Sequence, residues 1–243
     1  MVQNTKEKRA YVSEIFTSIQ GEGLHVGKPY LFIRFAGCNL ECHYCDTPRS
    51  RDKKYGKVLN LDQIICRIKR INHKIYKSVC LTGGEPLLYA DFIVHLLPEI
   101  KKLGCQVSIE TNGTLVKELK KVIHHLDILA VSIKPVSSGN RFSEKRYRDF
   151  LKTARFWLKL KKKGGYPSFF TKMIIDRETS ESEVVKIARM LASVDKGIPL
   201  VLQPATSGKG VYKNRLIRLQ LEATKYINDV RVIPQIHKIL GIK

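Results

Sequence analysis

The sequence predicts an α/β protein built as a partial, open TIM-like barrel of about six parallel βα units. Near-continuous apolar runs are typical of strands buried on both faces, and stretches with helical periodicity separate these runs. Polar and glycine-containing motifs follow the ends of the runs, where barrels of this kind build their sites. Six units are too few for a closed eight-stranded barrel, so we expect an open one.

The expected strands are short apolar runs rich in branched and aromatic residues. In chain order they are Tyr30–Phe35, Ser78–Thr82, Gln106–Glu110, Ile128–Ile133, Phe169–Ile175 and Leu200–Gln203. Amphipathic stretches between them predict the helices Leu61–Ile71, Asp91–Leu103, Leu115–His125 and Ser180–Ala192. Asn60 is a good N-cap and fixes the start of the first helix. A longer, basic helix is expected around Lys145–Lys163.

The chain of 243 residues is long enough to bury a sizeable core. We expect a single domain over residues 1–243, with an N-terminal site segment 11–28, a βα core 29–206 and a tail 207–243 that closes the site. No stretch approaches the roughly 20 apolar residues of a membrane span, and no apolar signal segment opens the chain. These features predict a soluble cytoplasmic protein without a membrane partner.

The charge is strongly positive, with 44 Lys and Arg against 22 Asp and Glu, a formal net charge of +22. Such a balance favours polyanionic partners or anionic substrates. The basic residues are spread out, however, in Lys6–Arg9, Arg49–Lys57, Arg67–Lys74, Lys145–Lys163 and Lys209–Arg218. No aromatic-studded RNA motif accompanies them. Solvated, lysine-rich helix faces therefore explain the charge better than nucleic-acid binding does.

Three of the six cysteines, Cys38, Cys42 and Cys45, form a C-x3-C-x2-C motif. Three thiolates can hold three irons of a [4Fe–4S] cluster and leave the fourth iron open for a ligand. A structural zinc site is the main alternative, but it needs a fourth ligand, and His43 lies squeezed between two of the cysteines. A disulfide is disfavoured because nothing indicates an oxidising compartment.

The other three cysteines are expected to be structural. Cys66 falls in an amphipathic helix, and Cys80 and Cys105 fall in apolar runs, where a free cysteine behaves as a small hydrophobe. None of them belongs to a second ligand group. We therefore predict one iron–sulfur centre and no auxiliary one.

Most of the distinctive segments follow predicted strands. The cysteine loop follows the first strand, Gly83-Gly84-Glu85-Pro86 the second, Thr111-Asn112-Gly113 the third, Lys134-Pro135 the fourth and Pro204-Ala205-Thr206 the sixth. The carboxyl ends of parallel strands meet at one end of a barrel, so these loops are expected to surround one site.

The cysteine motif and the glycine pair together resemble the radical S-adenosylmethionine (SAM) superfamily. A Gly-Gly pair after a strand is by itself typical of an ordinary turn, although it also lets a backbone approach a ligand closely. After a C-x3-C-x2-C loop, Thr82-Gly83-Gly84-Glu85-Pro86 resembles the element that holds the methionyl amino group of SAM. The resemblance implies a radical SAM core, in which SAM occupies the open iron and is cleaved by an electron from the cluster.

Further segments resemble 7-carboxy-7-deazaguanine synthases across nearly the whole chain. They are Glu14-Ile15-Phe16, Ile19-Gln20-Gly21-Glu22-Gly23, Phe32-Ile33-Arg34-Phe35-Ala36-Gly37, Cys45-Asp46-Thr47, Glu110-Thr111-Asn112-Gly113, Val131-Ser132-Ile133-Lys134-Pro135 and Pro234-Gln235-Ile236-His237-Lys238. The likeness thins between Arg141 and Gly165. This resemblance implies a radical ring contraction of 6-carboxy-5,6,7,8-tetrahydropterin to 7-carboxy-7-deazaguanine with release of ammonia, on the route to queuosine and other 7-deazapurines.

The resemblance also implies roles for individual residues, with a [4Fe–4S] cluster, SAM and Mg²⁺ as cofactors. The cluster ligands are Cys38, Cys42 and Cys45, and Thr47 is the magnesium ligand. The SAM contacts are Tyr44, Asp46, Gly84, Ser132, Ile133, Lys134, Gln203, Pro204, Ala205 and Thr206. The substrate contacts are Ile19, Gln20, Gly21, Glu22, Arg34, Thr82, His237 and, through its main chain, Lys243. No catalytic side chain is assigned, because the radical arises at the cluster-bound SAM.

Elementary chemistry supports some of these roles and leaves others open. The Arg34 guanidinium can grip a carboxylate or a planar polar ring in two-pronged fashion, and its flanks are apolar. The amide of Gln20 can both donate and accept, and Glu22 can accept from a guanidine-like ring edge. From sequence alone, however, Thr47 also fits a helix N-cap, and His237 also fits a helix or core position.

The implied partners are an acidic flavodoxin- or ferredoxin-type electron donor and a second copy of the chain in a homodimer. The basic helix around Lys145–Lys163 could cover the open side of the barrel, form the dimer face or dock the donor. Two other classes of function remain: a glycyl-radical-enzyme activase with the same cluster and SAM chemistry, and an RNA-directed modification factor. The Gln20–Gly23 and Cys45–Thr47 motifs argue against the activase, because they resemble a pocket for a small-molecule pterin. The only support for the RNA-directed factor is the net positive charge.

Overall fold

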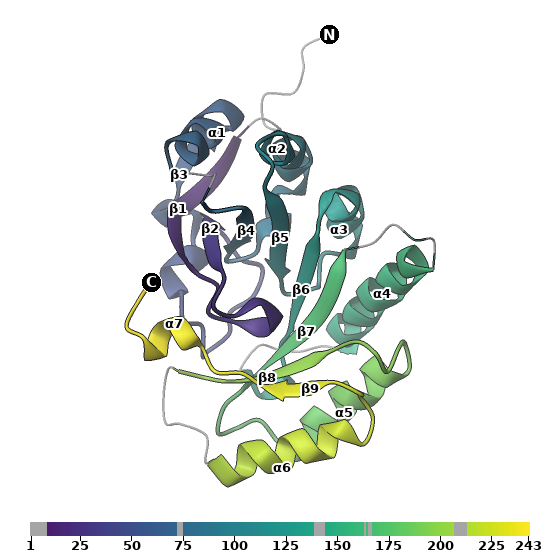
Figure 1. The fold of residues 1–243 in the computed structure, drawn as a ribbon. Helices are drawn as coiled ribbons and strands as arrows, with labels where there is room; N and C mark the ends of the chain where they lie inside the picture. Colours follow the sequence, from purple (N-terminus) through teal and green to yellow (C-terminus); the bar gives the residue numbers. More distant parts are fainter. Residues whose placement is uncertain (1–8, 72–74, 139–143, 163, 165–166, 207–212) are drawn as a thin grey trace.

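The structure is a computed structural model that describes residues 9–71, 75–138, 144–162, 164, 167–206 and 213–243. The described strands form one nine-stranded sheet in the order β3-β1-β2-β4-β5-β6-β7-β8-β9 (Figure 1). Strands β2 and β4 to β9 run parallel, whereas β1 pairs antiparallel with both β2 and β3. The open sheet confirms the predicted partial barrel.

All six predicted strands are present, each within one residue of its expected bounds. They are β2 (Pro29–Phe35), β4 (Ser78–Gly83), β5 (Gln106–Thr111), β6 (Ile128–Ile133), β7 (Ser168–Ile175) and β8 (Leu200–Pro204). The strands that the sequence did not predict are β1 (Arg9–Ile19), β3 (Lys57–Asn60) and β9 (Val230–Val232). Two of these are too short to show an alternating pattern, and β1 lies in the segment assigned to the site.

Most helices cover the outer face of the sheet, whereas the short last helix lies away from them near the C-terminus (Figure 1). The helices are α1 (Leu61–Arg70), α2 (Ala90–Lys102), α3 (Val116–Val122), α4 (Glu144–Lys161), α5 (Glu181–Ala192), α6 (Lys213–Thr224) and α7 (Ile236–Ile239). Asn60 caps α1 as predicted, and Gln63 returns the bond in a capping box. The predicted helix over Leu115–His125 is α3 followed by a 3₁₀ turn over Ile123–His125. No helix among the described residues is long and apolar enough to cross a membrane.

Strand alternation divides the side chains between two environments. In β2, Leu31, Ile33 and Phe35 pack into the main core under the helices, whereas Tyr30 and Phe32 pack on the inner face. The other strands follow the same rule, because successive side chains of a strand point to opposite faces. The inner face near the carboxyl ends of the strands is therefore where polar residues of the parallel strands meet.

The basic helix of the sequence is α4, the crossover between β6 and β7. Its apolar stripe, which includes Ala154 and Trp157, is buried in the main core, and the helix packs beside α3 and α5 (Figure 1). It thus belongs to the outer helical layer. Lys163 and residues 207–212 of the predicted tail lie outside the described residues.

One prediction about the remaining cysteines is wrong. Cys80 and Cys105 are buried, but Cys66 is exposed. Helix α1 buries Ile64 and Ile68, which lie one turn apart, and a residue midway between them points to the opposite side of the helix.

Candidate active site

One pocket at the carboxyl ends of the parallel strands collects nearly all residues that the sequence assigned to the site. Those lining it are Ile19, Gln20, Gly21, Glu22, Arg34, Cys38, Cys42, Tyr44, Cys45, Asp46, Thr47, Thr82, Gly84, Ser132, Lys134, Gln203, Ala205, Thr206, His237 and Lys243. Ile133 and Pro204 do not line it. Successive side chains of a strand point to opposite faces of the sheet, which explains why Ile133 and Pro204 do not line the pocket. Ser132 and Gln203 occupy inner-face positions of β6 and β8, and the residue after each points outward.

The cysteine end of the pocket is apolar. Cys38, Cys42 and Cys45 pack in one cluster with Leu40, Tyr44 and Ile174. Burial raises the pKa of the Cys38 thiol to about 11, as expected for apolar surroundings, and ligation to a metal would remove its proton. Three thiols on one loop, in apolar surroundings and lining a common pocket, fit the ligand set of a cluster with one open iron.

The glycine pair is packed against the start of the cysteine loop. A Cβ on Gly83 would overlap the backbone of Phe35, and one on Gly84 would overlap the backbone of Gly37. Gly84 N–H donates to Phe35 O at 3.1 Å, and Glu85 N–H donates to Gly37 O at 2.8 Å. The absence of side chains therefore lets two site loops dock backbone to backbone, in addition to leaving both glycines on the pocket wall.

Glu85 is fully buried behind this contact and carries no counterion in its hydrogen-bond set. Its carboxylate accepts from Leu87 N–H, Thr111 Oγ1 and Asn112 N–H at 3.0, 2.7 and 2.8 Å. Burial raises the pKa of Glu85 to about 7 against the opposing effect of these donors. The side chain ties the loop after β4 to the loop after β5.

The opposite end of the pocket is charged. Lys172, whose side chain is 2% exposed, lies between Glu22 Oε2 at 2.5 Å and Glu110 Oε2 at 2.9 Å. Gln20 Nε2 donates to Glu110 Oε1 at 3.0 Å, and Gln235 Nε2 donates to Glu22 Oε1 at 2.5 Å. We call these five residues the polar wall.

Gln235 links the polar wall to the SAM side predicted from the sequence. Besides Glu22, its amide contacts Asp46 Oδ2 at 2.9 Å, and its carbonyl accepts from Thr206 Oγ1 at 2.5 Å. On the same side, Gln203 is 1% exposed and its Oε1 has no hydrogen-bond partner among the described residues. A buried acceptor without a donor fits a ligand that brings an N–H or O–H group.

Arg34 is ion-paired and also forms part of the pocket wall. Its Nε donates to Glu14 Oε1 at 2.7 Å and its guanidinium lies over the Phe16 ring, yet the residue lines the pocket. Glu14 also pairs with the Lys243 ammonium. The ion pairs orient the guanidinium without removing it from the site.

The end of the chain folds back onto the N-terminal segment. Ser18 Oγ donates to the Lys243 main-chain oxygen, and Ile236 N–H donates to Gly21 O at 2.9 Å. The His237 ring packs so closely on Gly21 that a Cβ there would overlap it. The tail thus forms one side of the pocket, and His237 is a half-buried pocket residue.

Thr47 stands at the N-cap position of the 3₁₀ turn over Pro48–Arg51, but its side chain makes no capping hydrogen bond. The residue lines the pocket. Nearby, the Lys134 ammonium lies 5.7 Å from the centre of the Tyr44 ring. The capping interpretation of Thr47 therefore does not account for its side chain.

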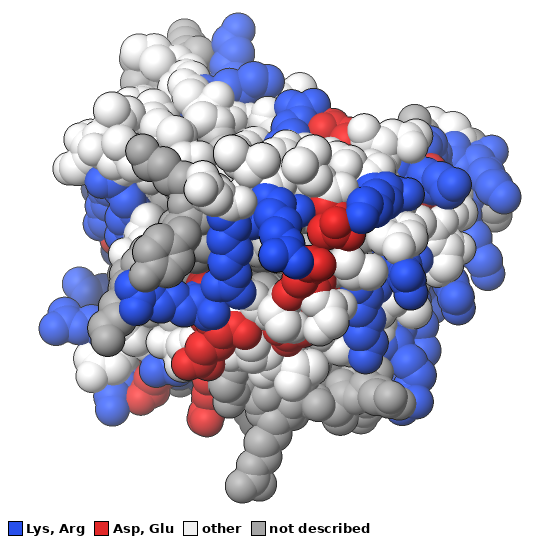
Figure 2. Space-filling model, turned by 90° about the horizontal axis from the view of Figure 1, so that it is seen from below, with Lys and Arg blue, Asp and Glu red and all other residues white. Residues whose placement is uncertain are grey.

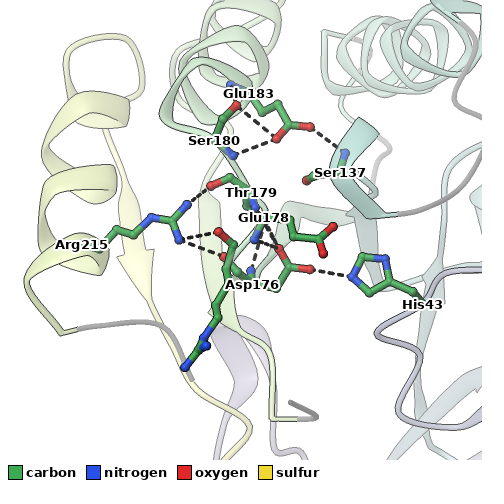
Figure 3. A network of polar contacts seen from close by, with 9 residues as sticks. His43, Ser137, Asp176, Glu178, Thr179, Ser180, Glu183 and Arg215 are labelled. Carbon is green, nitrogen blue, oxygen red and sulfur yellow. Dashed lines mark hydrogen bonds and ion pairs between the residues drawn. The ribbon is translucent and has the colours of Figure 1, made fainter. Parts of the chain in front are cut away.

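His43, the fourth ligand of the zinc alternative, is bonded elsewhere. Its Nε2 lies 2.9 Å from Asp176 Oδ2 in the turn between β7 and α5 (Figure 3). Asp176 also accepts from Thr179 N–H, and Arg215 of α6 donates to main-chain oxygens of the same turn. No three His, Cys, Asp or Glu side chains in the described parts of the chain are arranged to hold a single metal ion.

Three members of the polar wall had no assigned role: Glu110, Lys172 and Gln235. Lys172 could have been found from the sequence, because a lysine inside the apolar run Phe169–Ile175 is unusual. Its side chain points to the face of the strand opposite to that of Met173. Glu110 and Gln235 lay within segments that supported the family resemblance. Nothing local in the sequence shows that these residues meet.

Lys and Arg side chains gather on the left and right sides of the face seen from below Figure 1, and acidic side chains extend from its centre toward the lower left edge (Figure 2). These basic side chains are consistent with the net charge of +22. An anionic molecule approaching this face meets a positive field first.

Comparison with known proteins agrees with the site. The model of the radical SAM superfamily matches residues 32–196. The 7-carboxy-7-deazaguanine synthase of Methanothermobacter thermautotrophicus is 36% identical over 97% of this chain and 98% of its own. The synthase of the same name from Geobacter sulfurreducens is 32% identical over 96% and 97%. The crystal structure of QueE from Escherichia coli shares the fold, with a TM-score of 0.62, 21% identity and coverage of 94% and 95%. The chain belongs to the 7-carboxy-7-deazaguanine synthase family of the radical SAM superfamily.

Proposed function

We propose that this chain converts 6-carboxy-5,6,7,8-tetrahydropterin into 7-carboxy-7-deazaguanine with release of ammonia, a step of queuosine and 7-deazapurine biosynthesis. The observation that carries the proposal is the composition of one pocket. A cysteine triad in apolar surroundings lies at one end, and a wall of carboxylates and amides lies at the other. Radical chemistry needs the first, and recognition of a small, polar heterocycle needs the second.

Membership of the radical SAM superfamily implies that a [4Fe–4S] cluster and SAM are cofactors. Cys38, Cys42 and Cys45 would hold the cluster. When bound, the two groups together supply reductive C–S bond cleavage and hydrogen-atom abstraction. The side chains of Leu40 and Ile174 pack against the three cysteines and make this end of the pocket apolar.

The chain's own residues orient the two ligands toward each other. Gln203 offers an unpartnered buried acceptor on the SAM side, and Asp46 is held there by Gln235. On the substrate side, Glu22 can accept N–H groups from the pterin ring, and Arg34 can bind its carboxylate. Fixing both reactants in a near-attack arrangement is the main contribution that such a pocket makes.

Magnesium is the third cofactor of the proposal. Thr47 supports it, because the residue lines the pocket and its side chain makes no capping hydrogen bond. A hard cation that retains waters accepts a neutral hydroxyl together with substrate carboxylate oxygens. If magnesium binds there, Thr47→Val should raise the magnesium concentration needed for half-maximal activity, and an unchanged requirement would exclude this ligand.

An acidic flavodoxin- or ferredoxin-type protein is the proposed electron donor, and the proposed assembly is a homodimer. The basic side chains in Figure 2 support the donor, since charge complementarity speeds encounter. Reduction by such a donor should slow as ionic strength rises, and a rate that ignores salt would contradict this pairing. Light scattering of the purified protein tests the dimer.

The decisive experiment is anaerobic. The reconstituted protein receives SAM, dithionite, magnesium and 6-carboxytetrahydropterin, and mass spectrometry follows 7-carboxy-7-deazaguanine. We expect product from the native chain and none from Cys42→Ala. The exposed Cys66 provides the matched control, since Cys66→Ala should retain activity. Cleavage of SAM without conversion of the pterin would contradict the proposal and favour the glycyl-radical activase.

A further inference from the structure

The central member of the polar wall is a lysine in a position where lysines are rare. Lys172 occupies the middle of β7, and alternation turns it to the inner face while Thr171 and Met173 face the main core. With only 2% of its side chain exposed, it cannot be solvated by bulk water. A buried ammonium requires paired charges, and Glu22 and Glu110 supply them.

The pairing is not one to one. Two carboxylates share one ammonium, so the wall carries a formal charge of minus one. The Lys172 ammonium and hydrogen bonds from Lys172 and Gln235 overcome the effect of burial and lower the pKa of Glu22 to about 2. Both carboxylates are held in place by amides as well, Glu110 by Gln20 and Glu22 by Gln235.

Removing the ammonium would change the chemistry of the wall. Two carboxylates that face the same buried position repel each other, and one of them then takes up a proton. A protonated carboxyl group is a hydrogen-bond donor, whereas a carboxylate only accepts. The number of acceptors that the wall presents to a ligand therefore depends on Lys172.

We propose that Lys172 is a positioning residue that keeps Glu22 and Glu110 as acceptors, so that the wall selects a ring edge made of N–H donors. This inference rests on the proposed function. The 2-amino-4-oxopyrimidine edge of a pterin presents N–H groups at its exocyclic amine and its ring amide. A 2,4-dioxo analogue presents a carbonyl oxygen in place of the amine, and that oxygen faces the carboxylates without a proton between them.

A binding experiment on the reconstituted enzyme with SAM tests the inference without turnover. The probes are 6-carboxypterin and its 2,4-dioxo counterpart 6-carboxylumazine, titrated by their fluorescence. The native chain should prefer 6-carboxypterin by roughly 10- to 100-fold, the range expected for hydrogen bonds to charged groups. Lys172→Met should lose most of this preference, because a protonated glutamate can donate to the 2-oxo group. Lys102→Met, which breaks an exposed ion pair with Glu99, should leave the preference unchanged.

A charge-balanced variant separates this role from a purely structural one. Lys172→Met/Glu110→Leu removes the ammonium and the second carboxylate together, so Glu22 has no carboxylate beside it, stays ionised and only accepts, and the preference should return in large part. If Lys172→Met does not fold, Glu110→Gln alone tests the same point: it leaves a neutral wall and should lower the preference.

The outcomes distinguish the two proposals. A native chain that binds neither probe would overturn the proposed function and this inference together. A native chain that prefers 6-carboxypterin, with the same preference in Lys172→Met and Glu110→Gln, would overturn only the role of Lys172. Loss in Lys172→Met without recovery in the double variant would also overturn it, because a change of packing would then be enough to explain the loss.

Discussion

At the cysteine end of the pocket, the loops are joined by backbone contacts; at the polar wall, side chains from distant segments are joined by ion pairs and amide hydrogen bonds. The pKa of a buried glutamate is shifted in opposite directions at the two ends. Burial raises the pKa of Glu85 to about 7, whereas Lys172 and its hydrogen bonds help to lower that of Glu22 to about 2. Close backbone packing therefore sets the shape of the loops at the cysteine end. At the polar wall, a buried lysine sets the charge of the glutamates.

The largest effect is expected from a single methyl group at the cysteine end. Gly84→Ala places a Cβ against the backbone oxygens of Gly37 and Ser50, which cannot turn away as a side chain could. We expect a loss of about 3 kcal/mol in unfolding free energy, the upper part of the range for overpacking, together with loss of bound iron. Iron and sulfide content and urea unfolding measure both.

Gly104→Ala is the matched control for this variant. Gly104 has a φ of +75° but nothing within 4 Å of an added Cβ, so it tests backbone strain without overlap. It should cost about 1 kcal/mol and leave the iron content intact. Equal iron loss in both variants would show that strain or global instability, and not the contact between the two loops, explains the effect.

The same contrast explains how far the site could be predicted from the sequence. Cys38, Cys42, Cys45 and the glycine pair are contiguous motifs, so their meeting follows from the predicted order of strands and loops. The polar wall joins residues near positions 20, 110, 172 and 235, and only the folded sheet brings them together. Arg34 was assigned from the family resemblance and supported by its apolar flanks, and the argument from apolar flanks applies equally to Lys172.

The fold shows a similar division. The apolar parallel strands were predicted nearly to the residue, because each is a run bounded by a turn or a helix. Strand β9 was missed because three residues carry no periodicity, and β1 because the family resemblance assigned most of its residues to a site segment. The assignment of Ile133 and Pro204 to the site considered the loop after each strand and not the alternation along it.

A second prediction sharpens the comparison through the pH dependence of stability. Glu85 has a pKa of about 7 in the folded chain, above its usual 4.5, so the folded state holds the proton more tightly. Its contribution to stability is complete below pH 4.5 and is lost as the pH rises to 7, at up to about 1.4 kcal/mol per pH unit. Glu85→Gln, which stays neutral, should therefore gain stability relative to the native chain over this window.

Urea unfolding at pH 5, 6, 7 and 8 measures this difference. Glu99→Gln, at a partly exposed glutamate paired with Lys102, serves as the control and should follow the native chain. A constant difference between Glu85→Gln and the native chain at every pH would contradict the prediction. It would mean that the donors Thr111 and Asn112 keep Glu85 ionised throughout, as Lys172 does for Glu22.

The smallest effect is expected at the outer side of the cysteine loop, where His43 contacts Asp176 (Figure 3). His43 is 42% exposed, so His43→Ala should lower the unfolding free energy by less than about 1 kcal/mol and leave the iron content unchanged. Asp176→Ala should cost more, about 1–2 kcal/mol, because Asp176 also accepts from the N–H groups of Glu178 and Thr179. Thermal unfolding and iron analysis of the two variants measure both effects. Loss of iron in His43→Ala alone would contradict this prediction and show that His43 helps to hold the iron-binding group. Intact iron in both variants would show that the three cysteines and the backbone contact at Gly84 are sufficient to organise the cysteine end.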